Sequence, residues 1–160
     1  MATIKTANAS GRKPAPIPVA QEVVSIYEEK ALLVGEVVNG NIVQLAILPA
    51  GCVPVGYVLG STDVDTNGTP TATLDFGILD SAGTAISIAT ADGGDEWIDG
   101  STLPQAGGIA LHTASKALYD VLKDVQVSDE DRIVAVKFAT AVATAAAGTV
   151  SLELSYRAAR

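Results

Sequence analysis

The sequence predicts an all-β protein: an antiparallel β-sandwich of the jelly-roll type, with an extended N-terminal arm and at most one short helix. Apolar and polar residues alternate with period two in several segments, as in strands that bury one face. Turn residues separate these segments, and strands do not alternate with helical patterns, which favours antiparallel pairing. Three prolines at alternate positions near the start of the chain favour an extended arm.

The arm comprises residues 1–18 and differs in charge from the rest of the chain. It contains three basic residues and three prolines but no acidic residue: Lys5, Arg12, Lys13, Pro14, Pro16 and Pro18. The prolines fix the backbone near polyproline II geometry over residues 13–19. All 18 acidic residues lie in the remainder, so the arm and residues 19–160 attract each other. We therefore expect the arm to be held against a surface rather than free.

Residues 19–160 are expected to form a single β-sandwich domain. A chain of 160 residues with 48 % hydrophobic residues has enough apolar surface for one core, which excludes global disorder. The net charge of −8 has the wrong sign for a protein that neutralises phosphates over a broad surface. Nucleic acid is therefore not an expected partner.

The two clearest strand patterns lie at residues 72–78 and 150–156. Each alternates large apolar residues with Thr, Ser, Asp, Glu or Gly. Five further runs, rich in Val, Ile and Leu, fit the same pattern less cleanly: 32–38, 42–48, 53–59, 84–90 and 133–138. Turns are predicted at 39–41, 48–51 and 80–83, the first as a hairpin between two of these strands.

Two segments depart from the strand pattern. In residues 114–125, Leu118, Val121, Leu122 and Val125 are spaced by three and four, which predicts a short helix. Residues 140–148 consist mainly of Ala and Thr and are interpreted as a connection between the last two strands.

No targeting or membrane segment is expected. The N-terminus lacks the apolar run of a secretory signal. The longest mostly apolar stretch, residues 42–59, is interrupted by prolines and glycines that a spanning helix would not tolerate together.

The sequence contains no recognisable catalytic or cofactor-binding motif. His112 is the only histidine, and no serine near it lies in a nucleophile signature, so a surface or strand-end role is favoured. Cys52 has no basic neighbour in sequence that would lower its pKa, so a buried, inert thiol is expected. Paired carboxylates leave a small hydrolase as an open alternative, although few aromatic residues are present to stack on a sugar.

One segment resembles half of a calcium-binding loop. Asp63, Asp65, Asn67 and Gly68 match the first six positions of such a loop, but Leu74 stands where the closing carboxylate is required. A hydrogen-bonded hairpin loop is therefore the favoured interpretation, with cation binding left open and no metal site predicted.

Trp97 is the only tryptophan of the chain. Its large side chain either packs in the core or a loop, or serves as a contact residue on a surface, and packing is favoured.

Four segments together resemble the decoration proteins of tailed bacteriophages, also called cement or auxiliary head proteins. They are the 48–51 turn, the strand at 73–77 followed by Asp80, the loop 95–100 closed by 106–108, and the C-terminal run 146–156. They span most of residues 45–156 and are all turn-and-strand patterns. The helical pattern at 114–125 has no counterpart in this resemblance.

The resemblance implies a non-enzymatic virion protein that is made in the host cytoplasm and binds the outer surface of the capsid. Its implied partners are the major capsid protein and further copies of itself, as a homotrimer or homodimer. The chain is also too short for a tailed-phage major capsid protein of the usual fold. The residues expected to contact a neighbouring subunit or the shell are Lys5, Arg12, Lys13, Pro14, Pro16, Pro18 and Trp97. Alternatives are another virion component, such as a tail, spike or adaptor protein, and a carbohydrate-binding sandwich.

Overall fold

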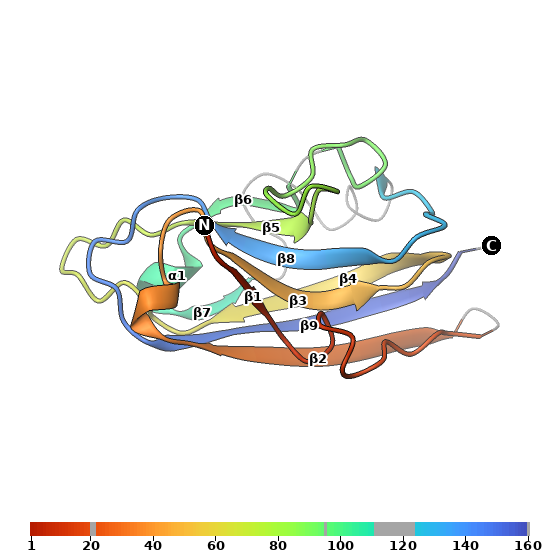
Figure 1. Cartoon of the computed structure of the whole chain (residues 1–160), viewed down its shortest axis with the longest axis horizontal. Helices are drawn as coiled ribbons and strands as arrows, with labels where there is room; N and C mark the ends of the chain where they lie inside the picture. Colours follow the sequence, from red (N-terminus) through yellow and green to blue (C-terminus); the bar gives the residue numbers. More distant parts are fainter. Residues whose placement is uncertain (20–21, 95, 111–123, 160) are drawn as a thin grey trace.

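The computed structural model shows two β-sheets packed face to face (Figure 1). It describes residues 1–19, 22–94, 96–110 and 124–159. Within these residues, every strand pair is antiparallel except β1 with β3, at the N-terminus. The predicted all-β sandwich is therefore confirmed.

The first sheet has five strands in the order β1-β3-β8-β5-β6. Their bounds are Thr3–Lys5 (β1), Ile42–Leu48 (β3), Arg132–Phe138 (β8), Leu74–Ile78 (β5) and Ile98–Ser101 (β6). The second sheet has four strands in the order β2-β9-β4-β7. Their bounds are Val23–Leu32 (β2), Gly148–Ala158 (β9), Cys52–Ser61 (β4) and Gly108–Ala110 (β7).

Helical structure is sparse in the described part of the chain. It consists of a 3-10 turn, η1 (Val34–Glu36), and a four-residue helix, α1 (Leu103–Ala106). Most of the predicted helix at 114–125 falls on residues 111–123, which lie outside the described residues. No helix within the described ranges has the length and apolar character needed to cross a membrane.

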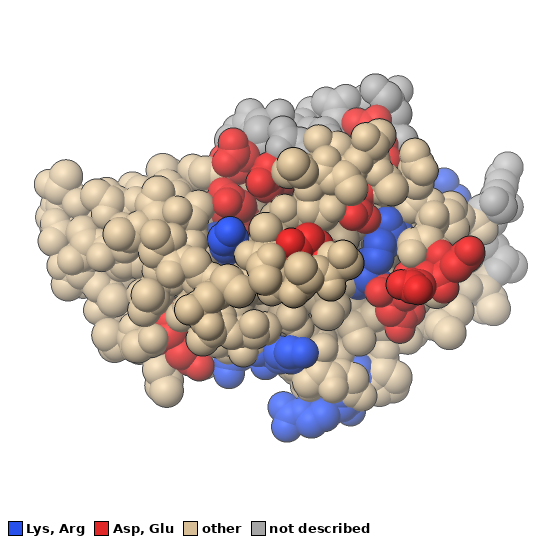
Figure 2. All heavy atoms as spheres, turned by 45° about the horizontal axis from the view of Figure 1, so that its top comes forward, with Lys and Arg blue, Asp and Glu red and all other residues tan. Residues whose placement is uncertain are grey.

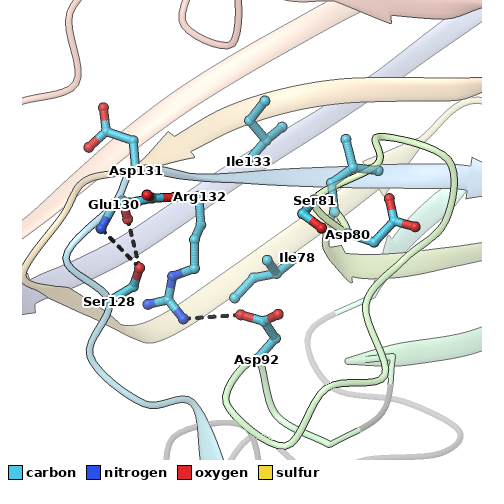
Figure 3. Close-up of a pocket in the computed structure, with 10 residues that line it drawn as sticks. Ile78, Asp80, Ser81, Asp92, Ser128, Glu130, Asp131, Arg132 and Ile133 are labelled. Atoms are coloured by element: carbon cyan, nitrogen blue, oxygen red, sulfur yellow. Dashed lines mark hydrogen bonds and ion pairs between the residues drawn. The ribbon is translucent and has the colours of Figure 1, made fainter.

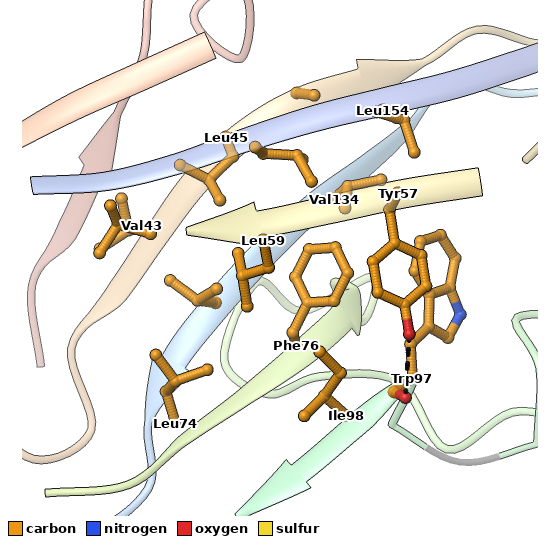
Figure 4. Packing of buried hydrophobic residues seen from close by; sticks show 14 of the residues in the cluster. Val43, Leu45, Tyr57, Leu59, Leu74, Phe76, Trp97, Ile98, Val134 and Leu154 are labelled. Carbon is orange, nitrogen blue, oxygen red and sulfur yellow. Dashed lines mark hydrogen bonds between the residues drawn. The ribbon is translucent and has the colours of Figure 1, made fainter. Parts of the chain in front are cut away.

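The core lies between the sheets and is centred on three aromatic rings (Figure 4). Tyr57 of β4 stacks on Trp97 with ring centroids 5.7 Å apart, and Phe76 of β5 lies 5.0 Å from Tyr57. Because Tyr57 belongs to the four-stranded sheet and Phe76 to the five-stranded one, these contacts join the two sheets. Burial raises the pKa of Tyr57 to about 12, since the phenolate would be poorly solvated there.

Two predicted strands are wrong. Residues 32–38 contain only the end of β2 and then η1, where the Glu36 carboxylate accepts the Leu33 N–H at 2.8 Å and turns the chain. The predicted 39–41 turn therefore does not connect two strands. Residues 84–90 form a loop with a single isolated bridge, between Leu79 and Ile86. Both runs are rich in apolar residues, but residues 33–38 and 84–90 belong to no sheet ladder in the structure described.

Strand β2 is the main element that the sequence pattern misses. Its inward face carries Glu28, which is only 6 % exposed, and Lys30, so the expected alternation of apolar and polar residues is hidden. The other predicted strands coincide with β3, β4, β5, β8 and β9, and residues 140–148 form a connection as expected.

Candidate interaction surfaces

Near its start the arm forms a strand of the protein's own five-stranded sheet, β1. β1 pairs in parallel with β3, and the side chain of Ile4 points into the core. Lys5, two residues from the start of this strand, is exposed. The basic charge at this position therefore lies on an edge of the five-stranded sheet.

The next part of the arm is fixed by two buried polar side chains. Thr6 Oγ1 donates to the Leu45 carbonyl at 2.6 Å. The amide of Asn8, which is fully buried, accepts the Ile47 N–H at 2.7 Å and donates to the Lys13 carbonyl at 3.1 Å. These bonds hold a compact turn against the edge of β3, because a buried amide and hydroxyl require partners.

The arm then crosses to the four-stranded sheet. Lys13 Nζ lies 2.5 Å from a carboxylate oxygen of the buried Glu28 on β2. Further on, the hydroxyl of Tyr156 donates to the Pro16 carbonyl at 2.7 Å. Burial, with a contribution from the charge of Cys52, raises the pKa of Tyr156 to about 12. The arm thus spans the open side of the sandwich and is held by its own chain.

The predicted contact residues divide into an exposed and a buried group. Five are exposed on the arm: Lys5, Arg12, Lys13, Pro14 and Pro16. Pro18 is buried, and Trp97 is fully buried in the core, where its indole N–H donates to the Asp92 carbonyl at 3.0 Å. Packing is therefore the role that the structure shows for Trp97, and its ring offers no surface to a partner.

Charge is distributed unevenly over the molecule. Figure 2 shows basic side chains gathered at the lower edge of one face, acidic side chains with a few basic ones among them over its upper and right-hand parts, and one end with almost no charge. Two loops that carry no charged residue, 66–74 and 139–147, lie at this end. The molecule therefore presents a basic edge, a face on which most charged side chains are acidic, and an uncharged end.

The calcium-like segment is a hydrogen-bonded loop, as the sequence favours. Asp65 is 1 % exposed, and its two carboxylate oxygens accept four backbone N–H groups from two loops. The donors are those of Thr71, Ala72, Ala143 and Thr144, at 2.8 to 3.1 Å. Desolvation raises the pKa of Asp65, but these bonds outweigh it and hold the pKa well below the ordinary value. The carboxylate therefore joins the loops.

The other two oxygen-bearing residues of that segment are also engaged locally. Asp63 Oδ1 accepts the Asp65 N–H at 3.1 Å, and Asn67 Oδ1 accepts the Thr69 N–H at 2.9 Å. Both are bonds to the backbone two residues onward, which are typical of Asx turns. No group of three or more potential metal ligands is found in the described part of the chain.

A hollow of about 430 Å³ lies at the start of β8 (Figure 3). Arg132 Nη1 lies 3.3 Å from Asp92 Oδ1, and Nη2 donates to the Cys52 carbonyl at 3.3 Å. The Ser128 hydroxyl donates to the Glu130 carbonyl and accepts the Glu130 N–H, both at 3.0 Å. The residues that line the hollow include no histidine, lysine or cysteine that could act as base or nucleophile. The role that these contacts show for Arg132 is structural: its guanidinium joins β8 to Asp92 in the 88–92 loop and to Cys52 of β4.

Cys52 and His112 have side chains that can act as a nucleophile or a base. Cys52 is 1 % exposed, and burial, together with the charge of Asp131, raises the pKa of its thiol. It is thus a buried thiol, as the sequence predicts. His112 lies outside the described residues.

Sequence reasoning missed two features of this surface. Asn8, which anchors the arm, gives no local signal, because its partner Ile47 is 39 residues away. The outward face of the four-stranded sheet was also missed, because β2 was not predicted. The outward positions Ser151, Glu153 and Ser155 of β9 were visible in the pattern and pointed to that face.

Comparison with solved structures finds similar chains in two phage capsids. In the capsid of Ralstonia phage GP4, a chain 32 % identical to this one superposes with a TM-score of 0.81, with 99 % of each chain covered. In the cyanophage Pam1 capsid asymmetric unit, a chain is 25 % identical with a TM-score of 0.61, covering 94 % of this chain and 96 % of that one. No protein-family model and no curated protein matches the sequence.

Proposed function

Because the chain belongs to a family of bacteriophage capsid proteins, we propose that it is a decoration protein. It binds the outside of the phage head and bridges neighbouring subunits of the major capsid protein. Its location is then the outer surface of the virion, and its role is structural rather than enzymatic.

The observation that carries this proposal is the end-to-end match with a capsid chain of the same extent. Both chains are covered over 99 % of their length, so the whole of that chain corresponds to one small sandwich. In the present chain every described strand pairs within the chain, and the arm closes the open side of the core. A subunit that completes its own core is suited to be added to a shell that is already assembled.

The mechanism of stabilisation is burial between subunits. A protein that binds two neighbouring capsid subunits adds interface that must be broken before the shell opens. Stabilisation then depends on occupancy and affinity, without any chemical step.

The exposed basic edge of the arm is proposed to take part in this contact. Lys5 and Arg12 are exposed, whereas Lys13 is paired with Glu28 in the same chain. The prolines Pro14 and Pro16 hold the backbone beside them in a fixed extended shape, which lowers the entropy lost on binding. The arm can therefore serve both its own fold and a partner.

The test is binding of the purified chain to undecorated shells, measured by co-sedimentation at increasing protein concentration. Arg12→Glu is expected to weaken binding about tenfold, because a reversed rim charge repels where it attracted. The matched control is Ser81→Glu with Ala82→Glu, which changes the net charge equally on an exposed turn. Deleting the arm is a poorer test, since β1 and Asn8 belong to the fold.

The possible results test the decoration role and the contact of the basic edge separately. Failure of the wild-type chain to bind shells, or a copy number of about a dozen instead of hundreds per virion, would contradict the decoration role. Equal binding by Arg12→Glu and the control would exclude the basic edge from the contact and leave the decoration role standing.

A further inference from the structure

The outward face of the four-stranded sheet exposes several large apolar side chains. Val23 and Tyr27 of β2 and Ile109 of β7 are 54 %, 57 % and 72 % exposed. Solvated sheet faces are usually polar, yet the outward positions of β2, β9 and β4 carry few charges. They include the valines Val23, Val53 and Val58, the serines Ser25, Ser151 and Ser155, the glycines Gly56 and Gly60, and the charged residues Glu29, Glu153 and Arg157.

The side chains on this face form alternating rows of large and small residues across the strands. Tyr27, Glu153 and Val58 lie side by side in one row, which we call the large row. Ser25, Ser155 and Gly56 form the adjacent row, which we call the small row. Neighbouring rows are about 7 Å apart, the length of two residues along a strand. The face therefore consists of a ridge beside a groove.

A hollow of about 300 Å³ lies beyond the large row. Gly60 and Ser151 form its floor, and a side chain at Gly60 would collide with the Ser151 hydroxyl. Glu29 contributes a carboxylate to its wall, where one oxygen accepts the Tyr27 hydroxyl at 2.8 Å. The hollow therefore combines free space with negative charge.

The positive charge of this face lies at its opposite end. Arg157 is six residues from Ser151 on β9, about 20 Å along the strand. Its guanidinium makes a local hydrogen bond, in which Nη1 donates to the Ala158 carbonyl at 3.4 Å. One face thus carries a guanidinium at one end and a hollow with a carboxylate at the other.

We propose that this face packs against the same face of a second copy with the strands reversed, so that Arg157 of each copy enters the hollow beside Glu29 of the other. This inference deepens the proposed function by naming a self-association surface, and it rests on that function. In the reversed arrangement the large row of each copy lies over the small row of the other. Arginine matches a carboxylate better than lysine does, because its planar group donates two parallel hydrogen bonds.

The opposite orientation is disfavoured by side-chain size and by charge. With the strands running in the same direction, each row would face the same row of the other copy: the two large rows would lie over each other, and the two Arg157 side chains would lie in facing rows. Packed sheets lie about 10 Å apart, so large side chains need small ones opposite them. This surface is therefore complementary to the same surface of a second copy of this chain whose strands run in the opposite direction.

The first test is the mass of the full chain in solution, measured by light scattering after size-exclusion chromatography. The wild-type protein is expected to associate in pairs. Ser25→Arg, which fills the small row, is expected to halve the mass, whereas Ser81→Arg on an exposed turn leaves it unchanged. Circular dichroism melting verifies that both variants fold. A monomeric or trimeric wild type, or a Ser25→Arg variant of unchanged mass, overturns the proposal.

A charge exchange provides the second test. Arg157→Glu and Glu29→Arg are each expected to weaken association about tenfold or more, because each places like charges together. The double variant restores the pairing in reversed sense, and association is expected to recover. Failure of the double variant to recover, with both single variants folded, would show that these residues do not meet.

Measuring pairing and shell binding separately distinguishes a wrong interface from a wrong decoration role. A chain that pairs through this face but does not bind shells retains the interface and contradicts the decoration role. A chain that binds shells, with pairing unaffected by Ser25→Arg, retains the decoration role and contradicts the interface.

Discussion

Asp65 shows how a single buried charge can organise one end of the protein. Its carboxylate accepts N–H groups from residues 71–72 and 143–144, which lie more than 70 positions apart in the sequence. The two loops carry no other charged residue. Their conformations therefore depend on one another through this side chain.

Replacement of Asp65 by Asn is expected to lower the melting temperature at pH 7 by roughly 5 °C or more, because the amide NH₂ meets N–H donors that then lack an acceptor. Thermal melting followed by circular dichroism measures this. Asp63→Asn is the matched control, since its remaining amide oxygen can still accept the Asp65 N–H. Equal melting temperatures for the two variants would contradict the role of Asp65.

The pH dependence of stability follows from the same bonds. Because the pKa of Asp65 is lowered in the folded protein, its contribution is fully present above the unfolded pKa of about 4 and is lost as the pH falls further. Urea unfolding at pH 7 and pH 3 is expected to show a smaller loss of stability for Asp65→Asn than for the wild type. An identical loss in both proteins would assign the acid sensitivity to other carboxylates.

At the scale of elements, the N-terminal arm is part of the fold and not an appendage. It adds β1 to the five-stranded sheet and then reaches Glu28 and Tyr156 of the four-stranded one. An arm that joins both sheets restricts how they can separate. The basic residues Lys5 and Arg12 are consequently displayed on a fixed edge.

Asn8→Ala is expected to destabilise the protein by about 1–3 kcal/mol, the cost of leaving a buried N–H group, here that of Ile47, without an acceptor. Chemical denaturation measures this difference. Ser10→Ala is the control: this exposed hydroxyl lies in the same turn, and the expected change is within about 0.5 kcal/mol. A similar stability for both variants would mean that the arm does not depend on Asn8.

For the whole molecule, Trp97 reports on contact between the sheets. It is the only tryptophan, and it stacks on Tyr57 of the opposite sheet. Tryptophan fluorescence and far-ultraviolet circular dichroism are therefore expected to give the same urea midpoint, as in a two-state transition. Tyr57→Phe, which keeps the ring and removes the hydroxyl bonded to the Trp97 carbonyl, is expected to preserve this coincidence. An earlier fluorescence change would show that the sheets separate before their strands unfold.

The sequence was most informative where one face of a strand is uniformly apolar. In β9, Val150, Leu152 and Leu154 point inward and are buried, so the period-two pattern is complete and its prediction is confirmed. In β2 the inward face includes Glu28, whose charge is satisfied by Lys13. The pattern fails there because the compensating partner comes from a different segment.

Sequence alone determined the class of fold, the acidic character of the body, and the separate character of residues 1–18, because these follow from local periodicity and from charge counts. Tertiary structure alone decided where the arm lies, that Trp97 is buried, that Asp65 joins two loops, and which side chains share the outward face of the four-stranded sheet. The physical reason is that each of these depends on contacts between residues far apart in the chain. Such contacts are set by strand order and register, which local patterns do not encode.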